Sequence, residues 1–335
     1  MTGWLGIDVG GANLKVADGS EFAHHQPFAL WQRPDELAEA LTGLLQQSPA
    51  CEAICATMTG ELADCYETKR DGVLHITNAL SEAAGDRRLV IYAVDGSFQS
   101  SASTFINPLR AAASNWHALA RFASRFLPNS TGLVIDIGST TADIIPVIAG
   151  EVASQSQTDF DRLVAGELVY TGASRTPVAT IVSSLPYRGL QVPVAAEFFS
   201  TTGDVQAILG YPLPDDAESA DGRGFSQQEC IDRLARQICV DRESFNLEDA
   251  ITACQYILPH QLFPLEMAAL RVLRSFPSGE VPVIISGSGE SLARQLVARL
   301  PRTTLVGSLG EQIGEVPSSC AAAVAVARLA MEQFS

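Results

Sequence analysis

The chain has 335 residues, which is above the usual length of one domain and predicts two lobes. Hydrophobic residues make up 47% and charged residues 18%, so the composition excludes a disordered chain and supplies material for a large core. The 38 acidic and 22 basic residues give a formal net charge of -16, which repels phosphate backbones and anionic lipids; we therefore expect neither a nucleic-acid nor a membrane partner.

The first part of the chain alternates between buried strands and helices. Apolar runs predict strands over residues 4–9, 53–58, 89–94 and 132–137. Leucines at helical spacing predict a helix that begins at Pro34, and a second helical pattern begins at Trp116 and stops at Pro128. This alternation is typical of an α/β fold.

The remainder of the chain continues the alternation around one insertion. Apolar runs predict strands over residues 179–182, 192–195 and 281–285. The acidic, glycine- and proline-containing stretch from Pro212 to Phe225 predicts a loop or insertion. Helical spacing predicts helices over residues 226–238, 247–258, 265–276, 289–300 and 318–331.

The cysteines and the N-terminus indicate a reducing compartment. The seven cysteines are scattered, and the set Cys51, Cys55, Cys65 and His75 lacks the paired spacing of a zinc site, so we expect free thiols. Asp8 falls where a signal peptide needs its apolar centre, and every long apolar stretch is interrupted before it reaches spanning length. We therefore expect a cytoplasmic protein.

One motif occurs twice. GIDVGGANLK, from Gly6 to Lys15, resembles VIDIGSTTAD, from Val134 to Asp143: each is an apolar strand, an Asp, a glycine and small polar residues. Small residues let the backbone approach a phosphate, and the Asp can hold a hydrated Mg²⁺ that binds it. A third glycine turn, Ser286-Gly287-Ser288-Gly289, follows the strand predicted over residues 281–285 and opens a helix.

The three turns, in this order, resemble the two phosphate motifs and the adenosine motif of the actin, sugar-kinase and heat-shock-chaperone superfamily. Within it, GIDVGG and DIGSTTAD are similar to the motifs of hydantoinase/oxoprolinase-type proteins. MTGELAD with Lys69-Arg70, and GELVYTG from Gly166, resemble a smaller group, the tetrahydromethanopterin-linked one-carbon-transfer proteins related to the archaeal methanofuran-biosynthesis synthase. The resemblance covers essentially the whole chain.

The superfamily resemblance implies an α/β fold of two ribonuclease-H-like lobes around a central phosphate-binding cleft. The N-terminal lobe, residues 1–130, would hold the first phosphate loop. The C-terminal lobe, residues 131–335, would hold the second loop, the adenosine-like turn and a helical insertion, and the last helix is a candidate to pack on the first lobe. The chain is much shorter than true hydantoinase or oxoprolinase subunits, so their ring-opening hydrolysis is not carried over.

Each candidate residue has a plainer alternative. Asp8 and Asp136 are the expected Mg²⁺ ligands, or caps of turns. Glu61 and Asp143 are the expected catalytic carboxylates, or acids at the start of a helix. The expected phosphate- or nucleotide-binding residues, which are otherwise parts of tight turns or the solvated surface, are Gly10, Gly11, Asn13, Lys15, Gly138, Ser139, Thr140, Thr141, Gly287, Ser288 and Gly289. Lys69, Arg70 and Arg175 are the expected substrate contacts. The alternative for Lys69 and Arg70 is a solvated turn, and the alternative for Arg175 is a structural salt bridge.

The narrower resemblance implies a transferase of methanofuran-type cofactor biosynthesis. It would condense an aminomethylfuran-methyl diphosphate with a tyramine or glutamyl-tyramine nucleophile and release diphosphate. Two alternatives stay open: an ATP-dependent small-molecule kinase or hydantoinase/oxoprolinase-like enzyme, and a non-catalytic nucleotide-binding regulator. The expected cofactor is Mg²⁺, with ATP in the first alternative, and the expected partner is a small phosphorylated molecule. The sequence leaves the oligomeric state open and allows a homodimer.

Overall fold

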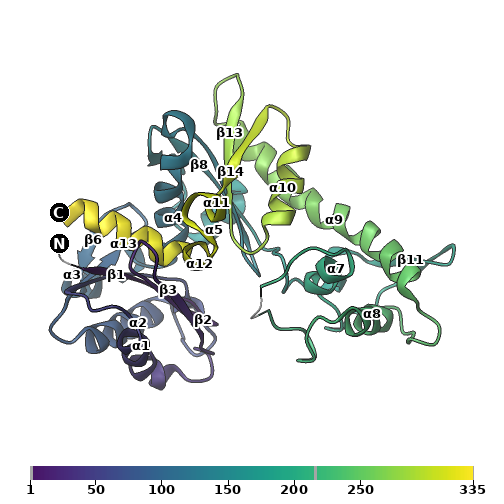
Figure 1. Ribbon diagram of the computed structural model, residues 1–335, viewed down its shortest axis with the longest axis horizontal. Coiled ribbons are helices and arrows are strands. Elements are labelled where there is room, and N and C mark those ends of the chain that lie inside the picture. The colour runs from purple at the N-terminus through teal and green to yellow at the C-terminus, as the bar shows by residue number, and fades with distance from the viewer. Residues whose placement is uncertain (1–2, 215–216, 335) are drawn as a thin grey trace. The chain divides into compact units, whose positions relative to one another are not determined.

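The computed structural model describes residues 3–214 and 217–334 as a mixed α/β protein with two compact units (Figure 1). Among these residues, unit 1 draws on Met1–Gly132, Val147–Arg162 and Gly307–Ser335, and unit 2 on Leu133–Pro146 and Leu163–Val306. The chain leaves unit 1 and returns to it twice, so the grouping is more interleaved than a single boundary between residues 130 and 131.

Unit 1 is built on a six-stranded sheet in the order β3-β2-β1-β4-β5-β6. Its strands are β1 (Trp4–Val9), β2 (Asn13–Ala17), β3 (Ala23–Pro27), β4 (Ala53–Met58), β5 (Arg88–Tyr92) and β6 (Phe98–Ser100). The first three strands form an antiparallel meander, and β4 and β5 continue the sheet in parallel with β1. This is the ribonuclease-H-like order expected for the N-terminal lobe.

Helices cover both faces of the unit 1 sheet (Figure 1). The helices α1 (Leu37–Gln46) and α2 (Lys69–Ala84) pack together on one face, and α13 (Ala321–Phe334) lies along β1 and beside α4 (Asn115–Ala123) on the other. Short helices complete the unit: α3 (Ser101–Ile106), α11 (Leu309–Ile313) and α12 (Glu315–Ser319). The C-terminal helix therefore completes the core of unit 1.

The sheet of unit 2 has the order β10-β8-β7-β13-β14, and the short strand β9 (Glu151–Val152) also pairs with β8. Its strands are β7 (Gly132–Ile137), β8 (Ala142–Ile148), β10 (Leu168–Val169), β13 (Val281–Ser286) and β14 (Thr303–Ser308). The central strand β7 runs parallel to β13, as β1 runs parallel to β4 in unit 1. The two units thus repeat one sheet plan.

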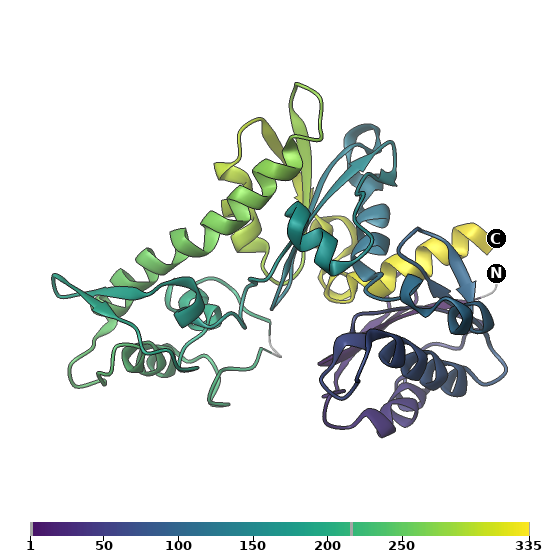
Figure 2. The same ribbon diagram turned by 180° about the vertical axis from the view of Figure 1, so that it is seen from behind.

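A long helix joins two separate cores within unit 2. The helix α9 (Leu247–Leu273) packs its C-terminal half against the sheet, and its N-terminal half lies in a second core formed by the insertion (Figure 2). The insertion holds α6 (Val178–Ile181), the hairpin of β11 (Ser184–Tyr187) and β12 (Leu190–Pro193), α7 (Thr202–Ile208) and α8 (Gln227–Arg236). The helices α5 (Asp159–Ala165) and α10 (Glu290–Arg299) complete the element order.

Two of the predicted elements are wrong. Residues 179–182 are not a strand, because the short helix α6 begins after Pro177 and the Thr180 hydroxyl donates to the Pro177 carbonyl. Residues 247–273 form one helix rather than two, because Pro259 and Pro264 are accommodated inside α9, whose apolar residues bind it to both cores. The loop expected over residues 212–225 is irregular where it is described; residues 215 and 216 lie outside the described residues.

The contact between β1 and α13 gives a stability prediction. A Cβ on Gly6 would lie 1.9 Å from the carbonyl oxygen of Ala323, so Gly6→Ala must push the helix away from the strand. We expect it to lower the free energy of unfolding by about 2–4 kcal/mol in urea denaturation. Gly43→Ala in α1 is the matched control, because a Cβ there meets no atom within 4 Å and should stabilise by roughly 0.5–1 kcal/mol. Equal stability of the two variants would contradict the tight β1–α13 contact.

Candidate phosphate-binding site

The first loop is a tight turn between β1 and β2. The backbone N–H of Gly10 donates to the Asn13 carbonyl at 3.0 Å, which closes the turn. A Cβ on Gly10 would lie 3.0 Å from the same oxygen, whereas a Cβ on Gly11 would meet no atom within 4 Å. Gly10 is thus needed for the turn itself, and Gly11 leaves open space in which a phosphate can approach the backbone.

Asp8 lies near the end of β1 with Lys15 directly opposite it on β2. Directly opposed residues on antiparallel strands have neighbouring side chains. Asp8 is 7% exposed, and its Oδ1 atom has no hydrogen-bond partner among the described residues. Burial raises the pKa of this carboxyl to about 6, against the opposing effect of the Lys15 charge. Asp8 is therefore a buried carboxylate whose burial the Lys15 charge offsets only in part, as expected for a group that binds a cation.

Glu61 lies immediately beside the first loop. It belongs to the short helix η2 (Gly60–Leu62), and a Cβ on Gly60 would lie 3.1 Å from the Gly10 carbonyl oxygen. Glu61 is 1% exposed, and its Oε2 atom has no hydrogen-bond partner among the described residues. Burial raises the pKa of Glu61 to about 7, with a further increase from Asp159 and a partly compensating effect of Lys69. A carboxyl group whose pKa is close to neutral pH can accept or donate a proton.

The second loop repeats the geometry of the first. The Gly138 N–H donates to the Thr141 carbonyl at 2.9 Å, as the Gly10 N–H does to Asn13. A second backbone bond is also repeated. In unit 1, the N–H of Thr59, which follows β4, donates to the carbonyl of Val9, the residue after Asp8, at 2.9 Å. In unit 2, the N–H of Gly289, which follows β13, donates to the carbonyl of Ile137, the residue after Asp136, at 2.7 Å. The sequence repeat is thus also a structural one.

The glycine turn after β13 is fitted against Asp136. Ser286 is the neighbour of Asp136 in the parallel pairing of β13 with β7, and a Cβ on Gly287 would lie 2.8 Å from the Asp136 Oδ1 atom. The turn opens α10 at Gly289, with Ser288 exposed beside it. Only a glycine fits at position 287, because a side chain there would collide with the Asp136 carboxylate. The turn therefore packs directly against this carboxylate.

The segment from Gly172 to Arg175 holds the second loop from the other side. A Cβ on Gly172 would lie 2.5 Å from the backbone of both Ser139 and Thr140. The backbone N–H of Ala173 donates to the Gly138 carbonyl, and those of Ser174 and Arg175 donate to the Ser139 carbonyl. The loop carbonyls are therefore occupied and the loop is fixed in place.

The other predicted residues lie in different surroundings. Asp143 is in β8 and pairs with Leu168 of β10. Lys69, in the first turn of α2, lies 3.9 Å from Asp159 and is part of the surroundings of Glu61. Arg70 is exposed, and the Arg175 side chain is exposed beside the second loop. Lys69 and Arg175 thus adjoin different loops, on different units.

Ser286 and Gly172 belong to motifs found in the sequence, but sequence reasoning assigned neither of them a role at these loops. Ser286 is 3% exposed, and its hydroxyl has no hydrogen-bond partner among the described residues, although it is aligned with Asp136. The role of Gly172 and its neighbours in holding the second loop was also missed. The only signal for Ser286 was its place at the start of the SGSG turn, and contact between Gly172 and Ser139 depends on tertiary packing.

The surroundings of Asp8 fit a hydrated divalent cation. Its buried oxygen lacks a partner, and carboxylate oxygen is the ligand type that Mg²⁺ prefers. Within residues 3–214 and 217–334, no group of three or more His, Cys, Asp and Glu residues could hold a metal ion. A cation here would therefore need water and substrate oxygens for most of its ligands. The expected free thiols are confirmed, because all seven cysteines are unbridged.

The hydantoinase/oxoprolinase family model matches residues 52–333. The chain belongs to this family. It is 33% identical over 98% of its length to a Methanocaldococcus jannaschii protein, named (4-{4-[2-(gamma-L-glutamylamino)ethyl]phenoxymethyl}furan-2-yl)methanamine synthase, of which it also covers 98%. A Methanococcus vannielii protein of the same name is 28% identical over 51% of this chain and 77% of its own.

Among solved structures, a nucleotide-free acetone carboxylase matches with a TM-score of 0.50 and 12% identity, over 97% of this chain and 70% of that one. This likeness concerns the fold alone. The family match confirms the predicted hydantoinase/oxoprolinase branch, and the first relative agrees with the narrower resemblance. Every helix in the described part of the chain is too short or too polar to cross a membrane.

The buried Glu61 predicts a pH dependence of stability. Its folded-state pKa is raised to about 7 by burial, so its contribution to stability is full below the unfolded-state pKa and is lost as pH rises through 7. We expect Glu61→Gln to match the wild type in unfolding free energy near pH 4 and to exceed it by about 2–3 kcal/mol at pH 8. Urea denaturation across this range measures the difference. A difference that does not change with pH would contradict a buried, titrating Glu61.

Proposed function

We propose that this protein is a Mg²⁺-dependent transferase of methanofuran-type cofactor biosynthesis. The observation that carries the proposal is the full-length similarity to the Methanocaldococcus jannaschii synthase. The name of that relative describes a furan-methanamine joined by a phenoxymethyl ether to a γ-glutamylated tyramine. The proposed reaction forms this ether from an aminomethylfuran-methyl diphosphate and the phenol of γ-glutamyl-tyramine.

In the proposed reaction, the bond between the furanmethyl carbon and the diphosphate oxygen breaks, and diphosphate leaves with the electron pair. The phenol oxygen forms the new bond to that carbon, and its proton passes to a carboxylate of the protein. No oxidant or reductant is needed. The charge that develops is on the leaving diphosphate, so catalysis would depend on groups that stabilise an anion.

The two phosphate loops supply groups of this kind. The Gly10–Asn13 turn and the Gly138–Thr141 turn have the same backbone geometry, and Lys15 adds a positive charge beside Asp8. Asp8 and Asp136 would hold Mg²⁺, which when bound neutralises charge on the diphosphate. Ser139 and Thr140 would donate from their hydroxyls.

Glu61 is the better-supported proton acceptor. It is buried next to the first loop, its Oε2 atom has no partner among the described residues, and its pKa of about 7 suits proton transfer at neutral pH. Asp143, in β8 of the other unit, is the second candidate. Lys69, Arg70 and Arg175 are proposed to bind anionic groups of the substrates.

A second candidate function is an ATP-dependent kinase or ligase. The observation that favours it is the Gly287–Gly289 turn, which opens α10 directly beside Asp136 and would accept the adenosine of ATP. Calorimetry separates the two: binding of ATP with Mg²⁺ but not of diphosphate favours the kinase, and binding of diphosphate alone favours the transferase. A nucleotide-binding regulator without turnover is the remaining alternative.

Removing either loop carboxylate should abolish most of the activity. Asp8→Asn and Asp136→Asn are each expected to lower the rate of diphosphate release, from the furan diphosphate and γ-glutamyl-tyramine, by at least about a hundredfold. Asp35→Asn, which removes an exposed carboxylate, is the matched control and should retain full activity. Wild-type protein that releases no diphosphate above the blank would contradict the proposed reaction.

A further inference from the structure

Unit 2 contains a pocket of about 300 Å³ in the insertion, away from the residues predicted from the sequence. The residues that line it are Phe198, Phe199, Asp221, Arg223, Arg233 and Arg236. Three guanidinium groups and one carboxylate give this wall a positive charge in a chain whose formal net charge is -16. A positive wall beside two aromatic rings suits an organic anion.

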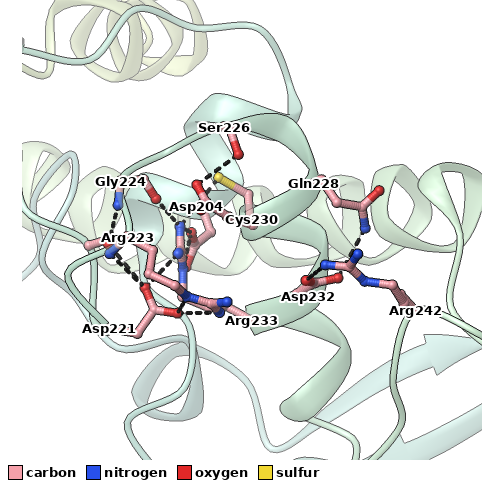
Figure 3. Close-up of polar contacts among 12 residues, drawn as sticks. Asp204, Asp221, Arg223, Gly224, Ser226, Gln228, Cys230, Asp232, Arg233 and Arg242 are labelled. Atoms are coloured by element: carbon pink, nitrogen blue, oxygen red, sulfur yellow. Dashed lines mark hydrogen bonds and ion pairs between the residues drawn. The ribbon is translucent and has the colours of Figure 1, made fainter.

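A network of ion pairs joins residues of the pocket to the buried Asp204 (Figure 3). Arg233, 1% exposed, forms an ion pair with the fully buried Asp204 at 2.7 Å and a second with Asp221 at 2.8 Å. Arg223 also pairs with Asp221 at 2.6 Å. Burial raises the pKa of Asp221, but hydrogen bonding from Arg223 and the charge of Arg233 outweigh burial and lower this pKa to about 2. Asp221 therefore stays ionised at neutral pH and keeps its ion pairs with Arg223 and Arg233.

Arg236 differs from the other two arginines of the pocket. It is exposed on the last turn of α8, and in the described part of the chain its side chain has no hydrogen bond or ion pair. Arg223 and Arg233 are already paired with carboxylates of the protein. Arg236 is therefore the guanidinium with its donors available to a ligand carboxylate, and Phe198, 56% exposed, lies on the same pocket.

The pocket is connected to the second phosphate loop through the start of α7. The Thr202 hydroxyl donates to the Gly172 carbonyl at 3.0 Å, and Gly172 packs on Ser139 and Thr140. Asp204, in the same turn of α7, is the buried partner of Arg233. Within unit 2, the loop and the pocket residue Arg233 are therefore linked by one turn of helix and the Gly172 segment.

We infer that this pocket binds the free amino-acid end of the γ-glutamylated phenol substrate, with Arg236 as the residue that binds its carboxylate. The inference rests on the proposed function. A γ-linked glutamyl group keeps its α-carboxylate, and the pocket offers the Arg236 guanidinium to bind it. The phenol lies at the opposite end of this extended substrate, so the pocket would anchor one end while the other reacts.

Arg175 is the competing residue for the same carboxylate, because its exposed side chain follows the segment that holds the second loop. The two assignments differ in position, one at the loop and one in the insertion. They can be separated by removing each charge in turn. Arg274, exposed at the end of α9 and outside the pocket, provides a control with the same change of charge.

The experiment measures binding of γ-glutamyl-tyramine and of tyramine by calorimetry, to the wild type and to Arg236→Gln, Arg175→Gln and Arg274→Gln. We expect Arg236→Gln to raise the Kd for γ-glutamyl-tyramine about tenfold or more and to leave the Kd for tyramine unchanged. In turnover, it should raise KM for γ-glutamyl-tyramine with little change in kcat. Arg236→Lys should recover part of the affinity, and Arg274→Gln should resemble the wild type.

Failure of this inference and failure of the proposed function give different results. Unchanged Kd and KM in Arg236→Gln, or a loss confined to Arg175→Gln, would overturn the pocket while the wild type still releases diphosphate. Selective binding of γ-glutamyl-tyramine that Arg236→Gln weakens, in a wild type that releases no diphosphate, would support the pocket and overturn the reaction. Wild-type protein that binds γ-glutamyl-tyramine no better than tyramine would also overturn the pocket.

Discussion

Both glycine loops, which are the candidate phosphate-binding segments, depend on a close backbone contact between two parallel strands. In unit 1 the Thr59 N–H donates to the Val9 carbonyl, and in unit 2 the Gly289 N–H donates to the Ile137 carbonyl. These bonds hold the residue after each Asp against the turn that follows the neighbouring strand. The contact leaves no room for a side chain at Gly287, where a Cβ would lie 2.3 Å from the Ile137 carbonyl oxygen. The position of the carboxylates therefore follows from backbone packing.

The first loop combines this rigid backbone with an unfavourable electrostatic environment. Asp8 and Glu61 are both buried, and each has an oxygen without a partner among the described residues. Burying such groups costs free energy, which the raised pKa values of about 6 and about 7 express. A bound cation would reduce this cost at Asp8, whereas Glu61, with a pKa of about 7, is partly deprotonated at neutral pH and can accept a proton. Two carboxyl groups in one unit are thus suited to different roles.

The sequence predicted the strands that enter the loops because their signals are local, but it did not predict β2 and β8, the strands that leave them. The strands β1, β4 and β7 are short buried apolar runs followed by glycine or small polar residues, and their predicted and observed bounds coincide. The insertion was harder, because a four-residue helix such as α6 and prolines inside α9 are determined by tertiary packing. The sequence did not predict the pocket around Arg236, because its residues come from segments up to 38 positions apart (236 − 198).

The helix α9 explains how the insertion can influence the second loop. Its buried Gln261 donates to the Gly172 carbonyl at 2.8 Å, and the Thr202 hydroxyl of α7 donates to the same oxygen at 3.0 Å. Gly172 is thus held by one helix that reaches both cores of unit 2 and by another that carries the buried partner of Arg233. Because Gly172 in turn packs on Ser139 and Thr140, a displacement of either helix must also displace the loop. The Asp204–Arg233 pair, one turn of α7 from Thr202, therefore belongs to the contacts that connect the insertion with the second loop.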